Sequence, residues 1–129
     1  MPEAQSMTIL IVDDQASMRG LLKFSLKQLG FANISEASSG QGALAEMQLN
    51  KFDLIISDWN MENIDGLELL KTIRSNPLTQ KTPFIMSTGN KDRERVKEAI
   101  QAGVNNYIVK PFNVETLKKK IEAVIGVLT

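Results

Sequence analysis

The chain alternates five times between a short apolar run and a longer segment in which apolar residues recur every three or four positions. The apolar runs predict strands over residues 8–13, 33–37, 53–58, 83–88 and 106–110. The longer segments predict helices over residues 15–29, 41–50, 65–75, 91–102 and 113–127. Strands and helices that alternate in this way form a parallel sheet with helices on both faces. The first, third and fourth runs are almost wholly apolar, which is typical of strands buried on both faces.

The alternation predicts an α/β fold with a doubly wound, five-stranded parallel sheet. In flavodoxin-like folds of this kind the strands lie in the order 2-1-3-4-5, and ligands bind at the carboxyl ends of the strands. A length of 129 residues predicts one domain, spanning residues 1–129. No linker or repeat interrupts the pattern. Residues 1–7 precede the first strand and are expected to form a flexible tail.

Composition excludes several kinds of chemistry. The chain has no cysteine and no histidine, so disulfides, Cys-based zinc sites and a histidine general base are excluded. Reactions must therefore use carboxylates, hydroxyls, lysines or the main chain. Basic residues are interspersed with acidic ones rather than with aromatics, so nucleic-acid binding is not predicted. The apolar runs are too short to span a bilayer, and no secretory signal is visible. A cytoplasmic monomer is expected.

Polar side chains stand at the carboxyl ends of four predicted strands. Asp13 and Asp14 follow the first strand, Asp58 ends the third, Thr88 ends the fourth and Lys110 ends the fifth. In the order 2-1-3-4-5 these four strands are neighbours, so their ends would line one shallow cleft. Taken alone, each group has a plainer interpretation as a turn residue, a helix cap or a surface lysine. The combination in one sheet is more specific.

The residue types at these strand ends suit phosphoryl chemistry. Two carboxylates 4 Å apart repel by about 4 kcal/mol at an effective dielectric constant of 20, so clustered acids require a counterion or a proton. Mg²⁺ prefers oxygen ligands and often binds one or two carboxylates together with a phosphate. Asp58 could act as a nucleophile that forms an aspartyl-phosphate. Lys110 and the Thr88 hydroxyl could stabilise the transferred group.

These motifs resemble the receiver domain of two-component response regulators, and the resemblance covers residues 8–128. The matching elements are Asp13-Asp14, Asp58, Thr88-Gly89 and Lys110-Pro111-Phe112. Three longer segments are especially similar to the single-domain chemotaxis regulators of this family. They are Ser57-Asp58-Trp59-Asn60-Met61, the segment 65–74 that begins Asp65-Gly66-Leu67, and Tyr107-Ile108-Val109-Lys110-Pro111-Phe112.

The resemblance implies a role for each site residue. Asp58 would accept a phosphoryl group from a phosphohistidine on a partner histidine kinase. Asp13, Asp14, Asp58 and the main-chain carbonyl of Asn60 would hold Mg²⁺, with Asp13 acting through water. Lys110 would contact the phosphoryl group. Thr88 and Tyr107 would form the switch that changes affinity for a partner, either the flagellar motor switch protein or a phosphatase. The Lys110-Pro111 peptide bond would be cis.

Several positions depart from the chemotaxis pattern. Glu62 replaces a proline after Met61 and adds an acid near the expected metal site. Gly89 replaces an alanine, and Asn90 occupies a position that tunes dephosphorylation in the family. On the surface that binds the motor switch, Lys97 and Glu98 replace small or apolar residues, and Ile100 and Val104 are larger than usual.

Three other functions remain open at this point. An aspartate-nucleophile phosphatase also uses a strand-end aspartate and Mg²⁺, but it usually has a second acid where this chain has Asn60. The segment Gly40-Gln41-Gly42-Ala43-Leu44-Ala45 fits the dinucleotide-binding pattern G-x-G-x-x-A, although a tight turn before a helix explains it better. The third is a receiver-type interaction module that is not phosphorylated.

Overall fold

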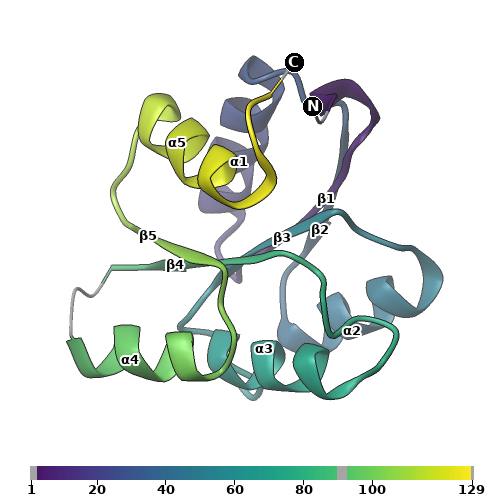
Figure 1. Ribbon diagram of the computed structural model, residues 1–129, viewed down its shortest axis with the longest axis vertical. Helices are drawn as coiled ribbons and strands as arrows, with labels where there is room; N and C mark the ends of the chain where they lie inside the picture. Colours follow the sequence, from purple (N-terminus) through teal and green to yellow (C-terminus); the bar gives the residue numbers. More distant parts are fainter. Residues whose placement is uncertain (1–2, 90–92, 129) are drawn as a thin grey trace.

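The computed structural model describes residues 3–89 and 93–128. Its sheet has five parallel strands in the order β2-β1-β3-β4-β5, with helices on both faces (Figure 1). The strands are β1 Thr8–Val12, β2 Asn33–Ala37, β3 Leu54–Asp58, β4 Phe84–Thr88 and β5 Asn106–Val109. The helices are α1 Ala16–Gln28, α2 Gly40–Leu49, α3 Gly66–Ser75, α4 Arg93–Gln101 and α5 Val114–Ile125. The predicted fold and strand order are confirmed.

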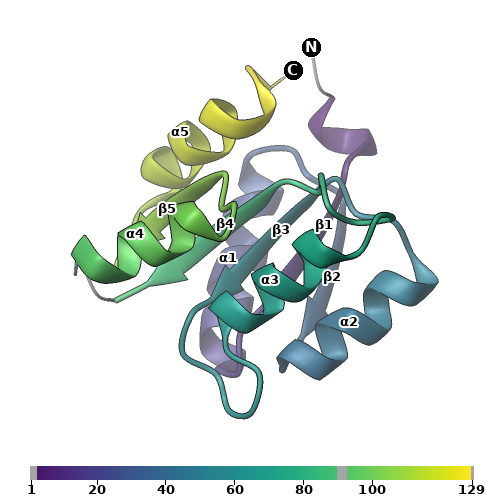
Figure 2. The ribbon, with the colours of Figure 1, turned by 60° about the horizontal axis from the view of Figure 1, so that its bottom comes forward.

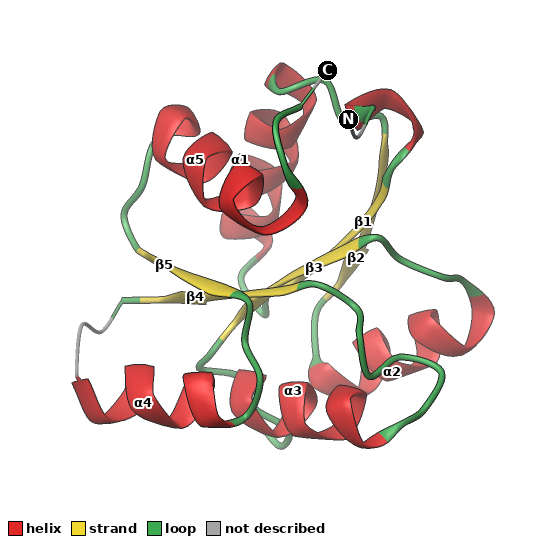
Figure 3. Ribbon diagram, viewed as in Figure 1, coloured by secondary structure: helices red, strands yellow, loops and turns green. Residues whose placement is uncertain are grey.

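The helices form two layers around the sheet. Helices α1 and α5 cover one face, and α2, α3 and α4 cover the other (Figure 3). The side chains of β1 alternate between these layers, because successive residues of a strand point to opposite faces. Ile9 and Ile11 pack with α1 and α5, whereas Leu10 and Val12 pack with the opposite layer. Burying each such side chain stabilises the fold by about 1.5–3 kcal/mol.

Polar side chains cap three of the helices. Ser39, Asp65 and Asn113 each accept a hydrogen bond from the main chain of the first turn of α2, α3 and α5, at 3.0, 2.8 and 2.8 Å. Such a cap contributes about 1 kcal/mol relative to alanine. The cap at Ser39 explains the start of α2. A Cβ atom on Gly40 would lie 2.8 Å from the Ile64 side chain, so the first glycine of the G-x-G-x-x-A pattern is explained by packing.

Two strands end one residue earlier than the sequence predicts. Asp13 and Lys110 lie just beyond β1 and β5 rather than in them. Each still donates one main-chain hydrogen bond to the neighbouring strand, to Ala37 over 3.1 Å and to Thr88 over 2.8 Å. The sheet therefore fixes the main chain of both residues and leaves their side chains at its edge. The predicted start of the fourth helix, residues 91–92, lies outside the described residues.

Residues 3–7, the described part of the expected flexible tail, are structured. Ala4–Ser6 form a short 3₁₀-helix, and the Met7 N–H closes it on the Ala4 carbonyl over 3.3 Å. Ala4 is buried within the cluster formed by α1, α5 and the sheet. Because the small side chain of Ala4 fits against Gly30, the described part of the segment contributes to the core.

Gly66 offers a test of how the end of β3 packs against α3. A Cβ atom there would collide with the Asp58 carbonyl oxygen, and it would lie 2.7 Å from the Met86 sulfur. We expect Gly66→Ala to lower the free energy of unfolding by about 1–3 kcal/mol, the usual cost of overpacking, as measured by urea denaturation.

Gly20→Ala is the matched control, because Gly20 lies on the exposed side of α1 and a Cβ atom there would meet nothing within 4 Å. This change should stabilise the fold by about 0.5–1 kcal/mol, since alanine is the better helix former. Equal effects of the two substitutions would contradict this account of Gly66.

Candidate phosphorylation and metal site

The site is built where four neighbouring strands end. Asp58 is the last residue of β3 and pairs in register with Ser87, one residue before Thr88 at the end of β4. Asp13 and Lys110 follow β1 and β5 directly. Figure 2 shows these strands side by side and running in the same direction, so their carboxyl ends share one edge. The predicted meeting of strand-end residues is confirmed for the acids and for Lys110.

Three carboxylates gather at this edge. Oxygen atoms of Asp13, Asp14 and Asp58 all lie within 4.8 Å of one another. Asp13 and Asp58 are buried, whereas Asp14 is exposed. Opposite oxygen ligands of Mg²⁺ lie about 4.2 Å apart, twice the usual metal–oxygen distance. The spacing and the all-oxygen donors therefore fit a small hard cation that solvent reaches from the side of Asp14.

Lys110 joins the two buried carboxylates. Its Nζ atom donates to Asp58 Oδ1 over 3.1 Å and to Asp13 Oδ2 over 3.2 Å. The lysine is partly buried, and water therefore screens these pairs less than it would at the surface. These hydrogen bonds place the ammonium group where it can also contact a group attached to Asp58. The Lys110-Pro111 peptide bond is cis, as the family resemblance implied.

Burial raises the pKa of the Asp58 carboxyl above its ordinary value of 3.8. The hydrogen bond and the positive charge of Lys110 act in the opposite direction, and the negative charge of Asp13 adds to the increase. Burial is the largest of these effects. A second cation beside Asp58 would favour the ionised carboxylate, which is the nucleophilic form.

The two predicted switch residues lie on the neighbouring strands β4 and β5. Thr88 is buried at the end of β4, on the strand next to Asp58. Tyr107 lies on β5, partly buried against the layer of α2, α3 and α4, with the Lys120 ammonium 5.0 Å from the centre of its ring. Tyr107 also lines a hollow of about 460 Å³ beside α4. Its ring is therefore placed to respond to a change at α4 or β4.

The loop after Asp58 borders the acidic cluster. Asn60, Met61, Glu62 and Asp65 line a shallow depression of about 340 Å³ together with Asp14. Glu62 is exposed and is not one of the three clustered acids, but it shares the depression, as expected for a fourth acid near the site. Asn90, the other position expected to tune the site, lies outside the described residues.

Two site features escaped sequence analysis. The Arg95 guanidinium of α4 lies 4.9 Å from the centre of the Trp59 ring and donates to Asn60 Oδ1 over 3.2 Å. Gly66 donates its N–H to the Trp59 carbonyl over 2.8 Å and lets α3 approach the end of β3 closely. Arg95 is 35 residues from Asn60 along the chain, so no local pattern could have related them.

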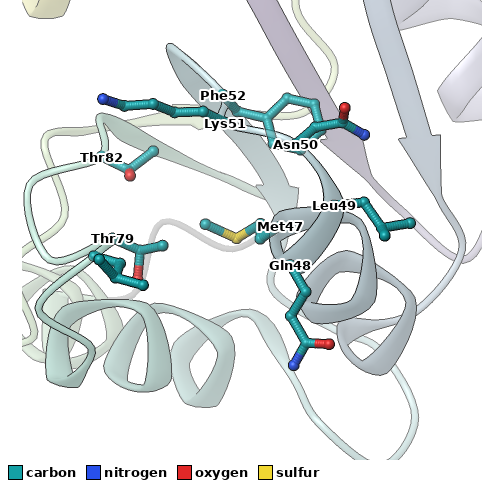
Figure 4. A pocket seen from close by; sticks show the side chains of 9 residues that line it. Met47, Gln48, Leu49, Asn50, Lys51, Phe52, Thr79 and Thr82 are labelled. Atoms are coloured by element: carbon teal, nitrogen blue, oxygen red, sulfur yellow. The ribbon is translucent and has the colours of Figure 1, made fainter.

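A separate recess lies at the other end of the sheet. It measures about 360 Å³ and is formed by the end of α2, the residues before β3 and those before β4 (Figure 4). Its lining, which includes Met47, Phe52 and Thr82, contains no acidic residue. The recess therefore offers no carboxylate to a cation, and it lies at the opposite end of the strands from the acidic cluster.

The family model for the response regulator receiver domain matches residues 9–122. This chain belongs to the response regulator receiver family. The receiver domain is 45% identical over 120 residues to chemotaxis protein CheY-3 of Vibrio cholerae serotype O1, covering 93% of this chain and 92% of that protein. It is thus a signalling protein of the predicted family.

Solved structures agree with this assignment. The chemotaxis response regulator CheY4 of Vibrio cholerae superimposes with a TM-score of 0.85 at 37% identity, covering 92% of this chain and 99% of that one. The receiver domain of a sensor histidine kinase from Pseudomonas aeruginosa superimposes with a TM-score of 0.84 at 26% identity, covering 93% of this chain and 98% of that one. That structure has a magnesium ion coordinated in its active-site cleft. Within the described residues, no helix is long and apolar enough to cross a membrane.

The raised pKa of Asp58 predicts how stability depends on pH. The folded chain keeps a proton on Asp58 at pH values where the unfolded chain, with a pKa near 3.8, has already lost it. Stability therefore falls as pH rises through the interval between these two pKa values. Without metal, we expect Asp58→Asn to raise the free energy of unfolding at neutral pH, and this gain should shrink as the pH is lowered through that interval.

Urea denaturation in EDTA across a pH series measures this difference. Glu62→Gln is the control, because it removes an exposed acid from the same depression and should change stability little. An Asp58→Asn variant that is less stable than the wild type at neutral pH would show that the Lys110 ion pair outweighs the cost of burial.

Proposed function

We propose that this receiver domain is a phosphorylation-operated switch in chemotaxis signalling, with Asp58 as the phosphoacceptor. The observation that carries this proposal is the arrangement of Asp58. Its carboxylate is buried beside Asp13 and bound to the Lys110 ammonium, with Asp14 close by. A carboxylate so placed has both an ammonium group and further carboxylate oxygens beside it, as phosphoryl transfer to an aspartate requires.

The phosphoryl donor would be a phosphohistidine on a partner histidine kinase, since this chain contains no histidine. A carboxylate oxygen of Asp58 attacks the phosphorus atom. A new O–P bond forms as the N–P bond breaks, and the histidine nitrogen leaves with the bonding electron pair and takes up a proton. Lys110 offsets the negative charge of the transferred group. Hydrolysis of the acyl phosphate later returns Asp58 to its carboxylate form.

Asp13, Asp14, Asp58 and the main-chain carbonyl of Asn60 would hold Mg²⁺, with Asp13 acting through water. The grouping of the three carboxylates and the magnesium ion in the related Pseudomonas receiver domain support this assignment. When bound, the ion would supply positive charge to the phosphoryl oxygens. Lys110 supplies positive charge beside both carboxylates, and at Asp58 this charge favours the ionised form of the carboxyl group against the effect of burial.

Thr88 and Tyr107 would carry the signal away from the site. The Thr88 hydroxyl would move toward the phosphoryl group, and the Tyr107 ring would move inward with it. The switched surface would then change its affinity for the flagellar motor switch protein or a phosphatase. Exposed Ile100, Lys97 and Glu98 on α4 belong to that surface, and their size and charge would determine which partner binds. Residues 1–129 would act as one cytoplasmic monomeric domain.

Trp59 provides the first test of phosphorylation. It is the only tryptophan, it is buried, and it adjoins Asp58. We expect a saturable change in its fluorescence on addition of Mg²⁺ and a further change with acetyl phosphate or beryllofluoride. Intact mass spectrometry should show one phosphoryl adduct per chain after reaction with acetyl phosphate.

Asp58→Asn is the control for this experiment and should abolish both the further fluorescence change and the adduct. A wild-type chain that binds neither Mg²⁺ nor a phosphoryl group would contradict the proposal. The chain would then be an unphosphorylated interaction module, and Glu62 would be the first residue to examine.

A second test concerns how completely Thr88 switches the domain. One charge-assisted hydrogen bond contributes about 1.5–3 kcal/mol, whereas a shift from 1:99 to 99:1 requires about 5.5 kcal/mol. We therefore expect the beryllofluoride-bound protein to populate both states. Tyr107 ring resonances in NMR spectra should lie between the two limiting positions.

Thr88→Val, which lacks the hydroxyl, should return these resonances toward those of the unliganded protein, and Thr88→Ser should retain most of the shift. A single, fully switched state in the wild type without a partner would disagree with this estimate.

A further inference from the structure

Arg95 connects α4 to the two residues that follow Asp58. Its guanidinium lies 4.9 Å from the centre of the Trp59 ring, and its Nη1 atom donates to Asn60 Oδ1 over 3.2 Å. Trp59 is itself fixed by the main chain, because its N–H donates to the Ser87 carbonyl over 3.0 Å and its carbonyl accepts from Gly66 over 2.8 Å. Asn60 is the first residue beyond these two fixed points.

An arginine is well suited to both contacts. Its planar guanidinium can stack on an aromatic ring while its N–H groups donate in the same plane. The ring of Trp59 is buried in the core, so it offers the guanidinium a rigid surface. Arg95 is partly buried, whereas Asn60 is exposed. The arginine therefore restrains a residue that the core itself does not hold.

We propose that Arg95 is a positioning residue for the cation site. It holds the Asn60 side chain against α4, and the Asn60 main-chain carbonyl is consequently kept in place beside Asp14 and Asp58. Groups that orient metal ligands in this way commonly raise metal affinity by about 10–100-fold. The inference rests on the proposed function, in which that carbonyl and the three carboxylates bind Mg²⁺.

The positive charge of Arg95 and its contacts with Trp59 and Asn60 should have opposite effects on Mg²⁺ affinity. A positive charge near three carboxylates repels a second cation, so its removal would strengthen Mg²⁺ binding if charge were its main effect. If Arg95 acts by restraining Asn60, its removal would instead weaken Mg²⁺ binding. Arg95→Lys separates the two effects, because lysine keeps the positive charge but lacks the planar guanidinium.

The test is calorimetric titration of the unphosphorylated protein with MgCl₂. We expect Arg95→Lys to weaken Mg²⁺ binding by about tenfold, at the lower end of the range for groups that orient metal ligands. The fluorescence of Trp59 should also change in the metal-free protein, because the guanidinium no longer lies over its ring. Affinity within twofold of the wild type, or higher, would overturn the inference.

Arg93→Lys is the matched control. Arg93 is an exposed arginine at the start of the same helix. The Arg93→Lys protein should bind Mg²⁺ with the affinity of the wild type. Circular dichroism of both variants monitors the helix. If Arg93→Lys weakened binding as much as Arg95→Lys, the effect would belong to α4 as a whole, and the inference would be wrong.

A double-mutant cycle identifies the route of the effect. Asn60→Ala removes the side chain that Arg95 holds and leaves the main-chain carbonyl in the chain. In this background, Arg95→Lys should weaken Mg²⁺ binding by less than twofold further, because the two changes break the same contact. A full additional loss would show that Arg95 does not act through Asn60, and this would overturn the inference.

The wild-type protein separates failure of this inference from failure of the proposed function. If the wild type binds Mg²⁺ and forms the phosphoryl adduct while Arg95→Lys binds Mg²⁺ equally well, only the role of Arg95 is wrong. If the wild type neither binds Mg²⁺ nor forms the adduct, the proposed function fails and the role of Arg95 fails with it.

Discussion

The sharing of one lysine ammonium by two buried carboxylates is the interaction on which the site depends. Asp13 and Asp58 both bind Lys110 Nζ, at 3.2 and 3.1 Å. Two such carboxylates without a counterion would repel by about 4 kcal/mol at 4 Å and an effective dielectric constant of 20. Lys110 offsets this repulsion with a single positive charge, whereas three carboxylates gather at the site. The excess of acidic groups over ammonium groups favours cation binding.

The layers of the fold keep this arrangement rigid. β1, β3 and β4 are buried almost throughout, and their side chains alternate between the α1–α5 layer and the α2–α3–α4 layer. A one-residue slip in register would turn every side chain of a strand to the opposite face, where it would no longer fit its neighbours, so close packing on both faces fixes where each strand ends. The same packing that forms the core consequently sets the positions of Asp13 and Asp58.

The loop after Asp58 is held in a different way. Gly66 allows α3 to approach the end of β3, and Arg95 reaches from α4 to Trp59 and Asn60. These contacts connect the end of β3 and the loop after Asp58 with α3 and α4. Helix α4 also lines the hollow beside Tyr107, so the proposed cation site and the proposed switch surface both involve this helix.

The sequence by itself determined the elements and their chemistry. Its apolar periodicity predicted five strands and five helices, and the polar residues at the carboxyl ends of the predicted strands identified Asp13, Asp14, Asp58 and Lys110. These signals are local, because periodicity and capping act within a few residues. Only the tertiary structure decided that Lys110 binds Asp13 and Asp58, 97 and 52 residues away, and that Arg95 holds Asn60. Such contacts depend on strand register and helix packing, which bring distant residues together and leave no local pattern in the chain.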